Sequence, residues 1–292
     1  MAFGSAVQPQ QDVGSIKALI KQHYGESRDV GPLKVDTWVR SSGLPMLCPL
    51  EEVLRARHEV VRKDTVDAAL MLTFLHGKSL HWGVQNELLA GLGVLVGVWK
   101  CLACSRSVGQ DEYDARQFDR LPARPKVCGS PECPSNASDY AEEREFLYME
   151  QLLRHEKFLI TGHADGFLRM PGLPGLGILE VKSVSQKSAW EIRSVPKMDH
   201  VVQAHLYMWM TGLKWAKLFY WDKSGYGITA LTEHTIHYEE TLIDKVKEGL
   251  VAMRAGLAGG PLPDRICQAD DCPRAQKCCV VKQCFAPEEK PF

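Results

Sequence analysis

Two short apolar segments joined by a Gly/Pro-rich turn carry the residues that most constrain this chain. Residues 157–170 contain the motif GHADG, which includes Asp165, and residues 176–184 contain the motif Glu180-Val181-Lys182. Apolar runs of this length, separated by the turn MPGLPGLG, predict two neighbouring strands. Neighbouring strands would bring Asp165 and Glu180 to one point, where two carboxylates repel each other unless a cation lies between them. Hard oxygen ligands of this kind suit Mg²⁺ or Mn²⁺.

The lysine of the second motif adds a positive charge to this predicted site. Lys182 lies two residues after Glu180, so the alternation of a strand places both side chains on the same face. A divalent ion beside a lysine is suited to hydrolysis of a phosphodiester, because both stabilise charge that develops on the phosphate. The alternative is purely structural: Asp165 would cap a turn before Gly166, and Glu180 and Lys182 would form a surface pair.

Two further motifs flank these strands along the chain. Residues 77–81, GKSLH, have the form GxxxH in a helical region, and the imidazole of His81 is a credible additional metal ligand. Residues 203–207, QAHLY, have the form QxxxY. Gln203 and Tyr207 are four residues apart and therefore share one helix face. Each of these two motifs is a weak signal when it is taken alone.

In their order along the chain, GKSLH, GHAD, EVK and QAHLY resemble the RecB-like branch of the PD-(D/E)xK nuclease superfamily, of the phage or CRISPR-associated exonuclease type. The resemblance spans residues 77–207 and implies an α/β fold: a restriction-endonuclease-like core with a central mixed β-sheet flanked by helices. It also implies the roles of individual residues. His81, Asp165, Glu180 and the backbone carbonyl of Val181 would hold the metal, Lys182 would serve the attacking water, and Gln203 and Tyr207 would support the active site and the DNA strand.

The ten cysteines fall mainly into two groups. The start of the chain lacks the basic residues and apolar stretch of a signal peptide, which favours a reducing cytoplasm and makes metal sites a better explanation than disulfides. The spacing of the first group is typical of a structural tetrathiolate zinc site, and the surrounding polar segment offers no core in which to bury free thiols. This group consists of Cys101, Cys104, Cys128 and Cys133.

The second group lies near the C-terminal end, and its spacing does not distinguish zinc from an iron–sulfur cluster. A subset of RecB-like nucleases carries a [4Fe–4S] cluster with one cysteine from the N-terminal region and three from the C-terminal end. By that resemblance Cys48, which begins Cys48-Pro49, would join three C-terminal cysteines. The spacing departs from the family pattern, and the adjacent Cys278 and Cys279 would supply one ligand between them. Two choices remain open: 267/272/278, or a set that ends at 284. The predicted ligands are therefore four of Cys48, Cys267, Cys272, Cys278 and Cys284.

The family resemblance and the two cysteine groups imply four regions, and hydrophobic periodicity predicts the helices and strands within them. Residues 1–99 form a mostly helical N-terminal part of the nuclease domain, with helices over 13–24, 49–61 and 68–92 and a break in the last near Gly77. Residues 100–134 form a zinc-binding insertion. Residues 135–262 form the catalytic core, with strands over 146–153, 157–170, 176–184, 215–222 and 228–238 and helices over 199–212 and 241–255. Residues 263–292 form a cysteine-rich iron–sulfur cap.

Charge and composition set limits on the partners. The formal net charge is −1, so DNA binding requires a local basic patch. Trp190, Trp209 and Trp215 lie in the best candidate segment and are candidates for base stacking. The basic residues of this segment are Lys182, Lys187, Arg193, Lys197, Lys214 and Lys217. No apolar run is long enough to span a membrane.

These features together predict a DNA nuclease, an exonuclease more than an endonuclease, that acts in recombination, replication or repair in the cytoplasm of a bacterium or phage-infected cell. A helicase, an integrase or another recombination protein is the expected partner, and nothing indicates an oligomeric state. The alternative is a non-catalytic module on a nuclease fold that binds DNA or a partner.

Overall fold

The computed structural model describes residues 16–24, 27–133 and 146–286. Its centre is a five-stranded sheet in the order β13–β12–β11–β10–β4. Strands β11 and β12 are parallel and the other neighbours are antiparallel, so the sheet is mixed, as the sequence predicts. The bounds of its strands are β4 (Leu95–Val96), β10 (Gly166–Leu168), β11 (Gly177–Val184), β12 (Trp215–Asp222) and β13 (Leu231–His237).

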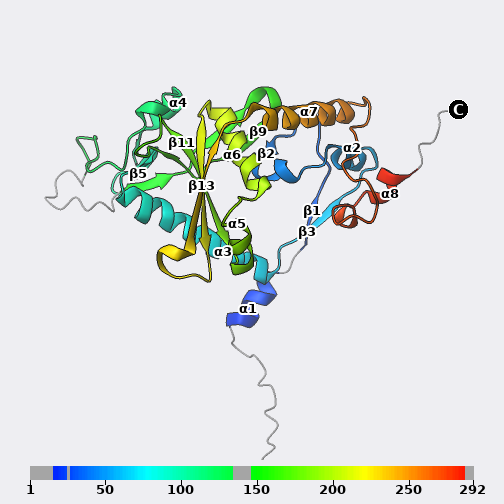
Figure 1. Ribbon diagram of the computed structural model, residues 1–292, viewed down its shortest axis with the longest axis horizontal. Helices are drawn as coiled ribbons and strands as arrows, with labels where there is room; N and C mark the ends of the chain where they lie inside the picture. The colour runs from blue at the N-terminus through cyan, green and yellow to red at the C-terminus, as the bar shows by residue number, and fades with distance from the viewer. Residues whose placement is uncertain (1–15, 25–26, 134–145, 287–292) are drawn as a thin grey trace, which may run out of the picture.

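Helices cover this sheet, which confirms the predicted α/β class. Figure 1 shows α7 to the upper right of the sheet and α3 across its lower part, with α1 projecting away from the rest of the protein. Helix α6 ends at Gly212, which has a φ of 79° and so adopts the left-handed conformation that glycine tolerates best. The helices are α1 (Ile16–His23), α2 (Pro49–Arg57), α3 (Ala68–Gly83), α4 (Gln110–Asp114), α5 (Gln186–Ile192), α6 (Met198–Thr211), α7 (Glu240–Leu257) and α8 (Val281–Phe285).

Strand β11 has a buried side chain on each face of the sheet, because successive residues point in opposite directions. Ile178 and Val184 belong to a core that includes residues of α6 and α7. Leu179 and Val181 belong to a second core. That second core also contains residues of the π-helix η2 (Val84–Leu89) and of a small three-stranded sheet. The site residues of β11 are thus held between two packed layers.

Three smaller sheets complete the strand pattern. Their orders are β1–β3, β2–β9–β8 and β6–β5–β7. The strands are β1 (Ser27–Val30), β2 (Val39–Arg40), β3 (Arg62–Thr65), β5 (Val98–Cys101), β6 (Ser107–Val108), β7 (Phe146–Met149), β8 (Leu152–His155) and β9 (Ile160–His163). Short 3-10 helices connect several of these elements: η1 (Ser41–Met46), η3 (Phe118–Arg120), η6 (Glu156–Phe158), η7 (Gly227–Ala230) and η8 (Ala275–Lys277).

Several sequence-based boundaries differ from the structure. The first 99 residues are less helical than expected, since they include β1 to β4 and part of β5. No break occurs at Gly77, which lies inside α3; the backbone changes to the π-helix after Gly83 instead. The predicted strand over 146–153 is two strands, β7 and β8. The predicted starts at residues 13 and 135 lie outside the described residues, and the four-part division of the chain stays a prediction.

The polar segment after Cys104 is also more structured than the sequence indicates. It contains β6, α4 and η3, and it contributes the buried side chains of Phe118 and Leu121. Two aromatic contacts hold it: Phe118 stacks on Phe167 of the central sheet with ring centroids 5.4 Å apart, and Tyr113 packs edge-on to Phe118. The expectation that this segment offers no core is therefore wrong.

Candidate active site

The central sheet brings the two carboxylates of the strand motifs together. Gly166 at the start of β10 pairs with Leu179 of β11, so the preceding residue, Asp165, falls opposite Glu180 as the antiparallel register continues. The Val181 backbone N–H donates to Asp165 Oδ2 at 2.6 Å. Both side chains are buried: Asp165 is 8% exposed and Glu180 is 1% exposed. The predicted strand over 157–170 is in fact two strands, β9 and β10, and Asp165 lies in the bend between them, directly before β10, whereas Glu180 lies within β11.

Helix α3 places His81 beside Asp165, and the residue that follows β7, Glu150, is a further member of the group that the sequence analysis missed. His81 Nδ1 lies 3.3 Å from Asp165 Oδ1. Ligand atoms of His81, Asp165 and Glu150 all lie within 4.8 Å of one another. Glu150 directly follows β7, and its carboxylate accepts a hydrogen bond of 2.8 Å from Gln85 Nε2. Its signal in the sequence was an acidic residue inside the otherwise apolar run FLYMEQLL.

Gln85 holds two members of this group in place. Besides its bond to Glu150, Gln85 Nε2 donates to the backbone oxygen of Asp165 at 2.6 Å. Asn86, the next residue of η2, accepts a 2.7 Å hydrogen bond from the Tyr148 N–H in β7. These bonds tie η2 to both strands that carry the acidic residues.

Glu180 is buried beside the charged groups of Asp165 and Lys182. Burial, together with the nearby Asp165 carboxylate, raises the pKa of Glu180 to about 8. Its Oε1 lies 2.5 Å from Lys182 Nζ, but its Oε2 is buried and has no hydrogen-bond partner among the described residues. A buried carboxylate oxygen without a partner is costly, and a bound cation would satisfy it. The residues present therefore fit a divalent ion.

The pKa shifts of the neighbouring bases reflect the same negative charge. Burial opposes the charged form of His81, but the hydrogen bond and charge of Asp165 outweigh burial and raise its pKa. Burial likewise opposes the charge of Lys182, and Glu180 with Asp165 outweighs it and raises the pKa of that lysine. Both bases thus lie in a negative field that would also attract a metal ion.

Lys182 is oriented by a chain of hydrogen bonds that reaches across α6. Lys182 Nζ donates to Gln203 Oε1 at 3.1 Å, and Gln203 Nε2 donates to the Tyr207 hydroxyl at 3.0 Å. The Tyr207 hydroxyl also accepts from Ser41 Oγ at 3.1 Å. The sequence predicted the shared face of Gln203 and Tyr207, whereas Ser41, in η1, belongs to no motif and was missed.

The first cysteine group converges as the spacing predicts. The four sulfurs of Cys101, Cys104, Cys128 and Cys133 all lie within 4.8 Å of one another. The Sγ–Sγ distances are 3.6 Å for Cys101–Cys133 and 3.6 Å for Cys104–Cys128. Four sulfurs about 2.3 Å from a zinc ion in tetrahedral geometry are about 3.8 Å apart, so the group fits zinc. Three of the four thiols are buried in the second core.

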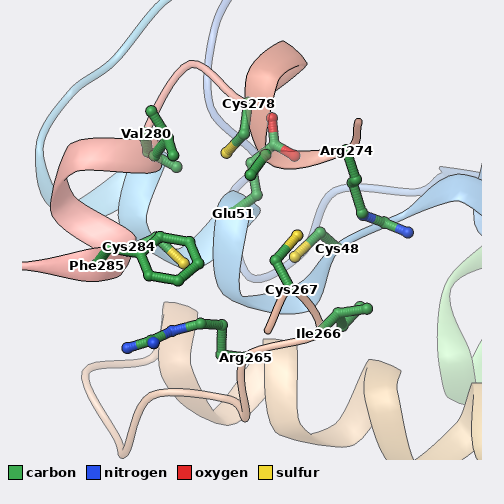
Figure 2. A pocket seen from close by; sticks show the side chains of 12 residues that line it. Cys48, Glu51, Arg265, Ile266, Cys267, Arg274, Cys278, Val280, Cys284 and Phe285 are labelled. Carbon is green, nitrogen blue, oxygen red and sulfur yellow. The ribbon is translucent and has the colours of Figure 1, made fainter. Parts of the chain in front are cut away.

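The second cysteine group brings the start of α2 together with the C-terminal segment that contains Cys267, Cys278 and Cys284. Figure 2 shows Cys48, at the start of α2, together with Cys267, Cys278 and Cys284 around one pocket. Ile266, Val280 and Phe285 complete an apolar wall, and Arg274 binds the Met46 carbonyl at 2.8 Å and so ties the two ends together. Burial raises the pKa of the Cys278 thiol to about 11.

The candidate cysteines that the spacing left open for this group differ in whether they line this pocket. Cys272 does not line the pocket, but its thiol interacts with that of Cys267, and its Sγ accepts a 3.4 Å hydrogen bond from the Ala275 N–H. Cys279 points its thiol at Glu51. Within the described ranges, the four pocket cysteines do not form a group with all ligand atoms within 4.8 Å, as the first group does.

The tryptophans proposed for base stacking do not form a common surface. Trp215 is 1% exposed, and its Nε1 donates to the Pro174 carbonyl. Trp209 stacks on His155 with ring centroids 4.2 Å apart and packs against the core. Trp190 is exposed, with the Arg193 guanidinium 4.1 Å from its ring centroid. The stacking hypothesis is therefore wrong for Trp215, which is core.

No protein-family model matches the sequence, and no curated protein matches it. Among solved structures, the chain is similar to an alkaline exonuclease (LHK-Exo) from Laribacter hongkongensis, with 14% identity and a TM-score of 0.45 over 77% of this chain and 90% of that chain. It is also similar to SSO0001, with 13% identity and a TM-score of 0.39 over 94% of this chain and 95% of that one.

A third similarity, to a phage-related exonuclease from Haemophilus somnus 129PT, has 17% identity and a TM-score of 0.27 over 37% of this chain and 58% of that one. Similarities this distant carry no functional argument, so function must be inferred from the site itself.

Proposed function

We propose that this protein is a metal-dependent DNA nuclease, and specifically an exonuclease, of the RecB-like PD-(D/E)xK type. One observation carries the proposal: Glu180 Oε2 is a buried, unpartnered carboxylate oxygen beside Asp165 and Lys182. His81, Glu150, Asp165 and Glu180 would hold Mg²⁺ or Mn²⁺, and the carbonyl of Val181 is a further candidate ligand. When bound, such an ion lowers the pKa of a water molecule and neutralises charge on the scissile phosphate.

The protein's own residues account for the remaining requirements of phosphodiester hydrolysis. The ammonium group of Lys182 is held by Glu180 and Gln203 and would stabilise the negative charge that develops on the phosphate as water attacks phosphorus. The phosphorus–oxygen bond to one sugar then breaks, and the departing oxygen takes up a proton. Gln203, Tyr207 and Ser41 keep the lysine oriented, and Gln85 keeps Glu150 and Asp165 in place.

The two cysteine groups have separate proposed roles. Cys101, Cys104, Cys128 and Cys133 would bind one structural zinc ion, which would hold β5 to the segment that follows it. Cys48, Cys267, Cys278 and Cys284 would bind a [4Fe–4S] cluster that joins α2 to the C-terminal cap. Cys272, one of the five candidates from the sequence, is left out of this set because it does not line the pocket.

The biological setting that follows from a DNA exonuclease is recombination, replication or repair, with a recombination protein, helicase or integrase as partner. In the described part of the chain, no helix is both long and apolar enough to cross a membrane.

The proposal is tested by incubating end-labelled single- and double-stranded DNA with Mg²⁺ or Mn²⁺, wild type beside Lys182→Ala. We expect shortened products from the wild type and none from the variant. If folded, metal-loaded wild-type protein cleaves neither substrate, the nuclease proposal is rejected in favour of a non-catalytic binding module.

A further inference from the structure

A large open cavity adjoins the candidate metal group on the side of α3. It has a volume of about 640 Å³, within the range of about 300–1,000 Å³ that is typical of ligand sites. His81 and Glu150 form part of its wall, so one end of the cavity is the candidate metal group itself. Whatever occupies the cavity would therefore reach the proposed cleavage point.

The wall that α3 supplies is unusually apolar for an exposed surface. All sixteen residues of α3 are described, and not one of them is buried. A helix as apolar as AALMLTFLHGKSLHWG normally packs into a core. Phe74 and Trp82 both line the cavity and are 48% and 49% exposed. Two aromatic side chains thus stand half in solvent beside a cluster of charged residues.

The cavity also has a cationic wall. Lys78 comes from α3, one turn before His81 and Trp82, and Lys223 directly follows β12; both line the cavity. The Lys223 N–H donates to the Val184 carbonyl at 3.0 Å, and this hydrogen bond holds the backbone of Lys223 against the end of β11. Aromatic faces interleaved with lysines are the combination that single-stranded nucleic acid needs, because bases stack on the rings and phosphates pair with the cations.

We infer that this cavity binds the single-stranded end of a DNA chain, with bases on Phe74 and Trp82 and backbone phosphates on Lys78 and Lys223. The inference rests on the proposed nuclease function, because that function gives the strand a cleavage point at His81 and Glu150. The bases of a duplex cannot stack on Phe74 and Trp82, because their faces are already stacked on one another inside the double helix. The strand therefore enters the cavity as a single strand.

Binding of fluorescently labelled 20-nucleotide DNA to the full-length protein, measured in buffer without Mg²⁺ or Mn²⁺ so that no cleavage occurs, tests this inference. Three ligands are compared: a single strand, a duplex, and a single strand of abasic sites that retains phosphates but has no bases. Phe74→Ala and Trp82→Ala are compared with Leu72→Ala, which removes an apolar side chain 50% exposed on the same helix that does not line the cavity.

We expect tighter binding of the single strand than of the duplex. Phe74→Ala and Trp82→Ala should each weaken single-strand binding at least about 5-fold and leave binding of the abasic strand unchanged, because only the former ligand can stack. Lys78→Ala with Lys223→Ala should weaken both single-stranded ligands and make binding less dependent on salt. Leu72→Ala should behave as the wild type.

Equal single-strand affinity in wild type, Phe74→Ala and Trp82→Ala overturns the inference. So does an aromatic variant that changes the oligomeric state in size-exclusion chromatography with no loss of DNA affinity, because α3 would then be a self-association surface. Because binding is measured without a metal, these results are independent of cleavage. The wild type could cleave duplex ends while the aromatic variants bind single strands normally. That result would leave the nuclease proposal intact and would reject only the proposed single-strand site.

Discussion

Lys182 Nζ lies 2.5 Å from one oxygen of Glu180, while the other oxygen of the same carboxylate is buried and unpartnered among the described residues. The two residues are neighbours on one face of β11, so the strand itself sets this pairing. Because Lys182 pairs with one oxygen of the carboxylate, the other oxygen is available to bind a second cation. This arrangement is the physical basis of the proposed metal site. It predicts that a change of either residue alters metal binding and cleavage.

Replacement of Glu180 by Gln should abolish cleavage without unfolding the protein. Glutamine keeps the shape but removes the charge that attracts the metal and orients Lys182. We expect a loss of at least about 100-fold in cleavage rate, comparable to the loss of one key electrostatic group in other enzymes. The rate is measured on end-labelled DNA, and circular dichroism checks the fold. Wild-type activity in Glu180→Gln would remove this residue from the mechanism.

Metal-free protein should lose stability as the pH rises, and Mg²⁺ or Mn²⁺ should restore it. The folded-state pKa of Glu180 is raised to about 8 from an ordinary value of 4.5. As the pH rises through this window, the unfolded chain loses the proton more readily, so the free energy of unfolding falls. Thermal unfolding in buffer without Mg²⁺ or Mn²⁺, between pH 5 and 8, measures this trend. In Glu180→Gln the trend should be weaker, and added metal should raise the melting temperature less than in the wild type.

Tyr207→Phe should reduce both activity and stability. The Tyr207 hydroxyl accepts hydrogen bonds from Ser41 and Gln203, so its removal leaves two buried donors without an acceptor at a cost of about 1–3 kcal/mol. Gln203 then holds Lys182 less firmly. Urea unfolding and the cleavage rate are the measurements. Ser41→Ala, which removes one donor and leaves the Gln203 bond, should have the smaller effect on both; the reverse order would contradict the proposed chain.

Loss of zinc should weaken the metal group of the active site as well as the insertion. Cys101 pairs with Phe146 at the start of β7, and Glu150 directly follows the other end of that strand. We expect one zinc per chain by elemental analysis and none in Cys101→Ser, with a lower melting temperature and weaker stabilisation by Mn²⁺. Cys279→Ser, whose thiol belongs to neither proposed site, is the control and should keep its zinc.

The iron–sulfur proposal is tested by comparing Cys48 and Cys284, which line the pocket, with Cys272, which does not. Anaerobically purified wild type should contain iron and sulfide and show broad visible absorbance. Cys48→Ser and Cys284→Ser should lose the absorbance and unfold at lower temperature, whereas Cys272→Ser should keep both properties because Cys272 lies outside the pocket. An unchanged iron content in Cys48→Ser would contradict the proposed ligand set.

Local sequence predicted the elements whose pattern is set by near neighbours along the chain. The alternation that places Glu180 and Lys182 on one face, the four-residue spacing that places Gln203 and Tyr207 on one helix face, and the glycine that ends α6 are all local properties. The Cys101–Cys104 spacing is also local, since these two residues lie in one turn, where the Ser105 N–H donates to the Cys101 carbonyl at 2.8 Å.

Only the tertiary structure decided which distant residues meet. Glu150 joins His81 and Asp165 because β7 and η2 pack together, and Ser41 reaches Tyr207 across 166 positions in the chain. Cys278 and Cys284 line a pocket with Cys48, whereas Cys272 does not, although spacing alone permits either set. Contacts between remote segments depend on how whole elements pack, and hydrophobic periodicity records which face of an element is apolar but not which partner covers it.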